Sequence, residues 1–84
     1  MAAIALHALP RALADHEVRE TVRTAAEALA ERQGVKLIHL WIDADGLEAE
    51  VEGASLVAMG FAAELRTTTT RWALHRGLGE LWRS

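Results

Sequence analysis

Apolar residues recur with the period of a helix between Asp15 and Gln33. The stripe falls at i, i+4, i+7 and i+11 and consists of Val18, Val22, Ala25 and Leu29. Charged residues cover most of the other side. Asp15 is placed to cap the amino end, and Gly34 can end the helix in the left-handed conformation. The pattern therefore predicts an amphipathic helix over 15–33.

Two strand-like segments follow, over 35–42 and 47–52, and Asp43-Ala-Asp-Gly46 lies between them. The first segment is rich in strand formers, the second alternates strictly, and an Asp-Gly step is a strong hairpin signal. A two-residue loop would pair Ile42 with Ala49, whereas a four-residue loop would pair Ile42 with Leu47. Because side chains alternate with period two, both loops leave every side chain on the same face of the hairpin.

The hairpin thus has one apolar face and one mixed face. The predicted core face consists of Ile38, Leu40, Ile42, Leu47, Ala49 and Val51. The predicted outer face consists of Leu37, His39, Trp41 and Asp43 opposite Glu48, Glu50 and Glu52. A large aromatic side chain is therefore expected among carboxylates.

A second stripe with helical spacing runs between residues 54 and 76. Its members fall at i, i+4, i+8, i+11 and i+15 and are Val57, Phe61, Leu65, Thr68 and Trp72. Ser55 or Gly53 is placed to cap its start, and Gly77 to end it. The β-branched run Thr67–Thr70 disfavours a helix, and a strand from Thr67 to Leu74 is the competing interpretation. No Gly, Pro or Asn separates the run from what precedes it, so we predict one continuous helix.

The two ends of the chain decide the topology. In residues 1–10 the alternation of Ile4, Leu6 and Ala8 with their neighbours indicates a strand, although Ala-rich sequence suits a helix equally well. With this strand the chain is an α+β, two-layer sandwich of order βαββα, in which an antiparallel hairpin packs against two helices. That order is the split βαβ, ferredoxin-like arrangement without its last strand. The alternative is αββα with a helical N-terminus. The tail, 77–84, holds two apolar residues that need a place to dock.

Length and composition narrow the class of protein. The chain has 84 residues, 51% of them hydrophobic and 25% charged, which predicts a single folded domain over 1–84. A domain of this size buries only about 60% of its surface, so we expect some apolar surface to meet a partner. With no Cys there are no disulfides or thiolate sites. The net charge of -3 argues against nucleic-acid binding, and no apolar run is long enough for a membrane span.

Localisation follows from the first residues. Met1–Leu9 is apolar but lacks the basic region and the cleavage site of a signal peptide, so we expect a cytoplasmic protein. The preference for Arg over Lys, together with abundant Ala, suggests a bacterial source.

Candidate chemistry is confined to the outer face of the hairpin. His39 lies opposite carboxylates, and a His-Glu pair can transfer protons, so His39, Glu50 and Glu52 are the candidate catalytic residues. His7 would point the same way, which makes His7, His39 and Glu52 candidate ligands for a divalent metal. The chain has no HExxH motif, phosphate-binding glycine loop or nucleophile motif. We therefore expect no cofactor and no metal, and lean against an enzyme.

Large apolar residues outside the predicted core favour an interface instead. Leu37, Trp41 and Trp82 are the candidate anchors, unless the chain's own tail covers Trp41. Residues 43–52 hold five acids and no base, whereas 64–84 holds four Arg against two Glu, so the acidic hairpin of one copy can attract the basic helix of another.

We expect a non-enzymatic interaction module, either a homo-oligomer or an accessory subunit of a larger bacterial complex. A regulatory domain that binds a small ligand beside the small-sided segment 54–63 is the alternative. A small enzyme that uses the His-Glu pair ranks third.

Overall fold

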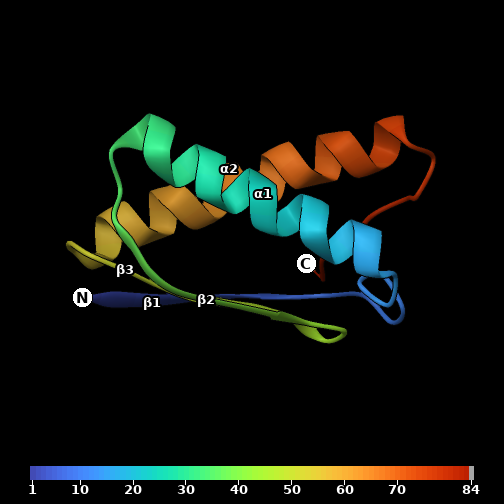
Figure 1. The fold of residues 1–84 in the computed structure, drawn as a ribbon, viewed down its shortest axis with the longest axis horizontal. Helices are drawn as coiled ribbons and strands as arrows, with labels where there is room; N and C mark the ends of the chain where they lie inside the picture. The colour runs from blue at the N-terminus through green and yellow to red at the C-terminus, as the bar shows by residue number, and fades with distance from the viewer. Residues whose placement is uncertain (84) are drawn as a thin grey trace.

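The described residues form three strands and two helices in the order βαββα. The computed structural model describes residues 1–83, with the elements β1 (Ala2–His7), α1 (His16–Gln33), β2 (Leu37–Asp43), β3 (Gly46–Val51) and α2 (Ser55–His75). β3 lies between β1 and β2 and is antiparallel to both. Both helices cover one face of this sheet, α1 over β2 and α2 over β1, and within residues 1–83 no helix covers the other face (Figure 1). The α+β fold and its βαββα order are confirmed, and the alternative with a helical N-terminus is wrong.

α1 begins and ends at the predicted signals. The Asp15 carboxylate accepts a hydrogen bond from the Glu17 backbone N–H at 2.8 Å. Gly34 adopts the left-handed conformation with φ 69°, and the N–H of Val35 then donates to the carbonyl of Ala30 at 2.9 Å. Neither α1 nor α2, the helices of the described residues, is long and apolar enough to cross a bilayer.

α2 differs from its prediction at the start and in the face it buries. Ala54, with extended backbone angles, precedes the first helical residue and makes no side-chain capping bond, so the predicted caps Ser55 and Gly53 are wrong. Gly77, at φ 72°, follows the end of the helix as expected. The buried face consists of Ala58, Phe61, Leu65, Thr69 and Ala73. Phe61 and Leu65 are thus buried as expected, whereas Val57, Thr68 and Trp72 are each replaced in the buried face by the next residue along the helix.

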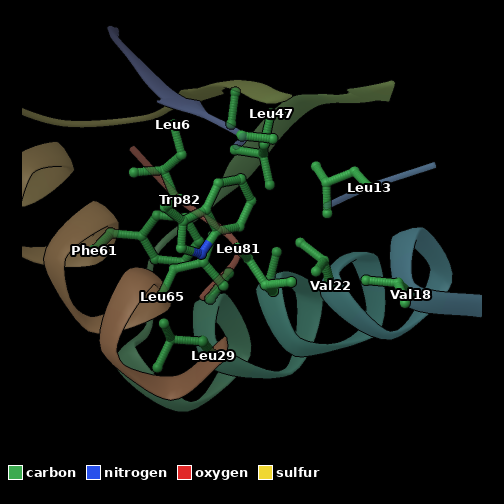
Figure 2. Packing of buried hydrophobic residues seen from close by; sticks show 14 of the residues in the cluster. Leu6, Leu13, Val18, Val22, Leu29, Leu47, Phe61, Leu65, Leu81 and Trp82 are labelled. Atoms are coloured by element: carbon green, nitrogen blue, oxygen red, sulfur yellow. The ribbon is translucent and has the colours of Figure 1, made fainter. Parts of the chain in front are cut away.

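The tail after α2 folds back into the core. Leu81 and Trp82 are only 1% and 3% exposed, and Trp82 forms a single antiparallel bridge with Ala8. The N–H of Arg83 donates to the carbonyl of His7 at 2.8 Å. Figure 2 shows the Trp82 ring among Leu6, Phe61 and Leu65. The expectation that Trp82 is an interface anchor is therefore corrected, because its surface is buried within its own chain.

Thr69 shows why the threonine run remains helical. Its side chain is 1% exposed, and its hydroxyl donates to the Leu65 carbonyl, one turn earlier, at 2.7 Å. The same hydroxyl accepts a hydrogen bond from the indole N–H of Trp82 at 2.9 Å. The Thr69 hydroxyl thus both donates and accepts a hydrogen bond inside the core. The indole N–H, the only polar group of the Trp82 side chain, has a partner there as well. This tertiary contact stabilises the helix at the run and offsets part of the intrinsic cost of four consecutive β-branched residues.

The hairpin has the register predicted for the four-residue loop, but only Ala44 and Asp45 lie between its strands. Ile42 pairs with Leu47, and Asp43 pairs with Gly46. The Asp43 carboxylate stabilises the turn by accepting hydrogen bonds from the backbone N–H of Asp45 at 2.8 Å and of Gly46 at 3.2 Å.

A β-bulge near the start of β2 reverses two predicted side chains. The register shifts between Leu37 and His39, so Ile38 has no partner of its own on β3. Leu37 then lies opposite Val51 and packs against the core, although the alternation placed it on the outer face. Ile38, predicted in the core, is not among the residues packed there. One inserted residue is enough to move the side chains at the start of the strand to the opposite face of the sheet.

Gly46 is required where β1 crosses the end of the hairpin. A Cβ at this position would fall against the Leu6 carbonyl oxygen and 3.2 Å from the Cα of His7. We expect Gly46→Ala to lower the free energy of unfolding by about 1–3 kcal/mol, because β1 must move. Gly60→Ala is the matched control, since no atom lies within 4 Å of its added Cβ. Gly60 lies within α2, so this change should instead raise stability by about 0.8 kcal/mol.

Urea denaturation followed by circular dichroism measures both changes. Equal effects of the two substitutions would contradict the role of Gly46 in the close approach of β1.

Candidate functional site

The face of the sheet that no helix covers, the open sheet face, is built from three rows of side chains that cross the strands. Reading from β2 through β3 to β1, the rows are His39–Glu50–Ala3, Trp41–Glu48–Ala5 and Asp43–Gly46–His7. The predicted outer positions downstream of the bulge are thus confirmed. The open sheet face carries an aromatic ring, two imidazoles and three carboxylates in separate rows.

Trp41 is the most prominent apolar group of the open sheet face. It is 53% exposed, and its ring stacks on that of His39 with 4.9 Å between centroids and 19° between planes. Hollows of about 480 and 280 Å³ lie on this face, and Trp41 and Glu48 line both. The second hollow exists because Ala3 and Ala5 present only methyl groups to this face. An exposed tryptophan that stacks on a neighbour and lies beside open hollows is a candidate interface anchor.

The chain's own tail does not cover Trp41. Trp82 belongs to the core formed with the helices, whereas Trp41 pairs with Glu48 on the other face of the sheet and is 53% exposed. The explanation that the tail shields Trp41 is therefore wrong. The Trp41 side chain is therefore exposed on the open sheet face.

The candidate acid-base pair has the predicted register but not the contact. His39 lies directly opposite Glu50, yet among the described residues no hydrogen bond or ion pair joins them. The His39 ring instead stacks on Trp41. The imidazole of His39 thus contacts the indole of Trp41 and not the carboxylate of Glu50.

The candidate metal ligands do not come together. His7 lies in the row of Asp43, four residues along β2 from the row of His39, which corresponds to about 13 Å. Glu52 lies beyond the end of β3 and forms an exposed ion pair of 3.8 Å with Lys36. Within residues 1–83 no group of three or more His, Cys, Asp or Glu side chains could hold a metal ion.

The charge of the open sheet face is one-sided. Asp43, Glu48 and Glu50 contribute three carboxylates, and its rows contain no Lys or Arg. An acidic surface of this kind attracts a basic partner and repels a second acidic face.

Two features of the surface were missed by the sequence reasoning. Trp72, expected in the core stripe, is only half-buried and lines a groove of about 870 Å³ between α1 and α2, with Arg76 5.9 Å above its ring. Leu56 and Met59, in the first turns of α2, are 79% and 65% exposed. The uncharged stretch 54–63 was the available signal, because it is apolar on every side and the sheet covers only one.

Comparison with family models, with curated proteins and with solved structures finds no match for this chain. The functional argument accordingly rests on the exposed groups described above and on their chemistry.

Proposed function

We propose that the chain is a non-enzymatic protein-interaction module, acting as a homo-oligomer or as an accessory subunit of a larger complex, with the open sheet face as its contact surface. The exposed ring of Trp41, stacked on His39, carries the proposal. Tryptophan is among the residues most enriched at the energetic centres of interfaces. The surrounding carboxylates would form the polar rim.

The chemistry of the face indicates the kind of partner. Because the rows of the face carry only negative formal charge at neutral pH, we infer a basic surface with an apolar hollow that receives Trp41. The second half of α2 is an example within this chain. There Arg66 and Arg71 flank Leu74 around a hollow of about 410 Å³. A second copy can therefore supply the partner surface in a homo-oligomer, and a similar helix of another protein can do so in a complex.

Site-specific photo-crosslinking tests the proposal without knowing the partner. A benzophenone amino acid replaces Trp41 in one variant and Leu78, a residue of similar exposure outside the sheet, in the other. We expect a defined adduct from position 41 only, at twice 9.2 kDa for a second copy or at another discrete mass for a different protein. Its yield should fall in high salt, because salt screens exposed charges. Equal labelling from both positions, or none from position 41, would reject the open sheet face.

The groove between α1 and α2 supports a second candidate, the binding of a small ligand in a regulatory domain. Trp72 offers an aromatic wall and Arg76 a positive charge at one end of this groove. A ligand held there would raise the melting temperature saturably in a metabolite screen. Trp72→Leu should abolish that rise and Trp41→Glu should not.

A further inference from the structure

β1 lies at one edge of the sheet, and none of the described residues pairs with most of its outer side. Among the described residues, 1–83, the tail pairs only with the end of this strand. The Arg83 N–H donates to the His7 carbonyl, and the Leu9 N–H donates to the Leu81 carbonyl, each at 2.8 Å. From Ala2 to Leu6 no described strand lies on that side. We call this segment the free edge of β1.

The backbone groups of the free edge follow from the alternation of the strand. The His7 carbonyl and the Leu9 N–H both point to the tail, whereas the Ala8 N–H points back and donates to the Asp45 carbonyl. Alternate residues of a strand direct their N–H and C=O groups to the same side. Ala3 and Ala5 therefore present two N–H and two C=O groups outward, a template for another strand.

The other edge of the sheet is protected against such pairing. β2 contains the bulge at Ile38, follows Lys36 and ends at Asp43. Bulges and charges are the usual means by which edge strands avoid unwanted partners. The free edge of β1 has none of them, because residues 1–6 include no charged side chain and no Pro, and its register with β3 is regular.

The helix above the free edge is apolar as well. α2 packs on β1, and its first turns lie over the N-terminal end of that strand (Figure 1). These turns expose Leu56 and Met59, and no charged residue occurs between Ala54 and Ala63. A second sheet joined at β1 would bring its own α2 alongside and remove this apolar surface from water.

We infer that the free edge of β1 pairs antiparallel with the same edge of a second copy, giving a continuous six-stranded sheet. Ala3 of each copy then exchanges two backbone hydrogen bonds with Ala5 of the other, and a two-fold axis passes near Ile4. A second copy fits because an antiparallel edge is complementary to itself and this one carries no charge to repel its equal. The inference goes beyond the proposed function, since it uses another surface and names the partner.

Pairing at β1 would double the area of the open sheet face. Three strands of six or seven residues span about 14 by 20 Å, or roughly 300 Å² of planar area, whereas a stable interface buries about 800 Å² on each partner. Two sheets joined at β1 place both copies of Trp41 on one surface of twice that extent. The dimer is thus a better platform for a partner than one chain.

Ala5→Pro tests the pairing. Proline lacks the N–H that the free edge needs, but this N–H points away from β3, so the internal ladder is kept. We expect native mass spectrometry and light scattering to give twice 9.2 kDa for the unchanged chain and for Ala5→Ser, which retains the N–H. In the Trp41→Glu background, which weakens contacts of the open sheet face, Ala5→Pro and Ala3→Pro should give 9.2 kDa with unchanged circular dichroism, whereas Trp41→Glu alone should give twice 9.2 kDa. A monomeric unchanged chain, or a folded dimer of Ala5→Pro in the Trp41→Glu background, would overturn the inference.

Amide hydrogen exchange decides the case even if the proline variants fail to fold. In the unchanged dimer the amides of Ala3 and Ala5 should exchange slowly, and dilution should accelerate them. Fast exchange of both amides while the protein is dimeric would also overturn the inference. Trp41→Glu separates the two proposals, because it should weaken contacts of the open sheet face and leave the edge dimer intact.

Discussion

Trp82→Ala is expected to lower the free energy of unfolding by about 3–5 kcal/mol, the usual cost of truncating a buried aromatic residue. Its side chain is 3% exposed and fills the space between the sheet and α2 (Figure 2). A domain of 84 residues has a total stability of only about 4–13 kcal/mol. The substitution therefore removes a large share of it, and a fraction of the molecules should be unfolded at physiological temperature.

The effect has an apolar part and a polar part that can be separated. Trp82→Phe keeps most of the apolar ring but loses the hydrogen bond to Thr69, and Thr69→Val leaves the indole N–H buried without its acceptor. Each should cost about 1–3 kcal/mol. In a double-mutant cycle the pair should show a coupling of about 1 kcal/mol, because the second substitution removes a bond already broken.

Trp41→Ala is the matched control, since it removes the same side chain from a position that is 53% exposed. Its cost should be about 1 kcal/mol or less in urea denaturation of the monomer. If Trp82→Ala were no more destabilising than this control, the tail would not be part of the core.

Local signals account for what the sequence predicted correctly. Asp15 and Gly34 mark the two ends of α1 through hydrogen bonds to residues two to four positions away in the chain. The Asp-Gly step marks the hairpin turn. These interactions join residues close in the chain, so their spacing is visible in the sequence. The acidic and aromatic positions of the open sheet face were predicted for the same reason, because strict alternation holds beyond the bulge.

Contacts between distant segments account for the errors. An apolar residue such as Trp82 has the same pattern whether its own chain or another covers it, so the sequence could not distinguish a core residue from an interface anchor. The bulge at Ile38 left no signal, since Leu37 and Ile38 are equally suited to either face. The stack of His39 on Trp41, however, was within reach, because residues two apart on a strand lie side by side on one face.

Trp41→Glu is expected to weaken the association through the open sheet face by at least about 2 kcal/mol, or roughly 30-fold in the dissociation constant. The substitution removes the aromatic anchor and adds a fourth carboxylate to the rows that hold Asp43, Glu48 and Glu50. The added carboxylate would still attract a basic partner. The loss of affinity therefore measures how much the Trp41 ring contributes by filling the hollow of that partner. The size of the effect therefore distinguishes an anchor from a charged rim.

The measurement is a titration of the chain against the species captured from position 41, at fixed salt. Leu78→Glu is the matched control, since it adds the same charge at a residue 48% exposed outside the sheet. Both variants should unfold at urea concentrations close to that of the unchanged chain, because neither side chain is buried. If the two variants weaken binding equally, added negative charge is sufficient to explain the loss. Trp41 would then contribute nothing specific, and the contact surface would have to be sought on the free edge of β1 or along α2.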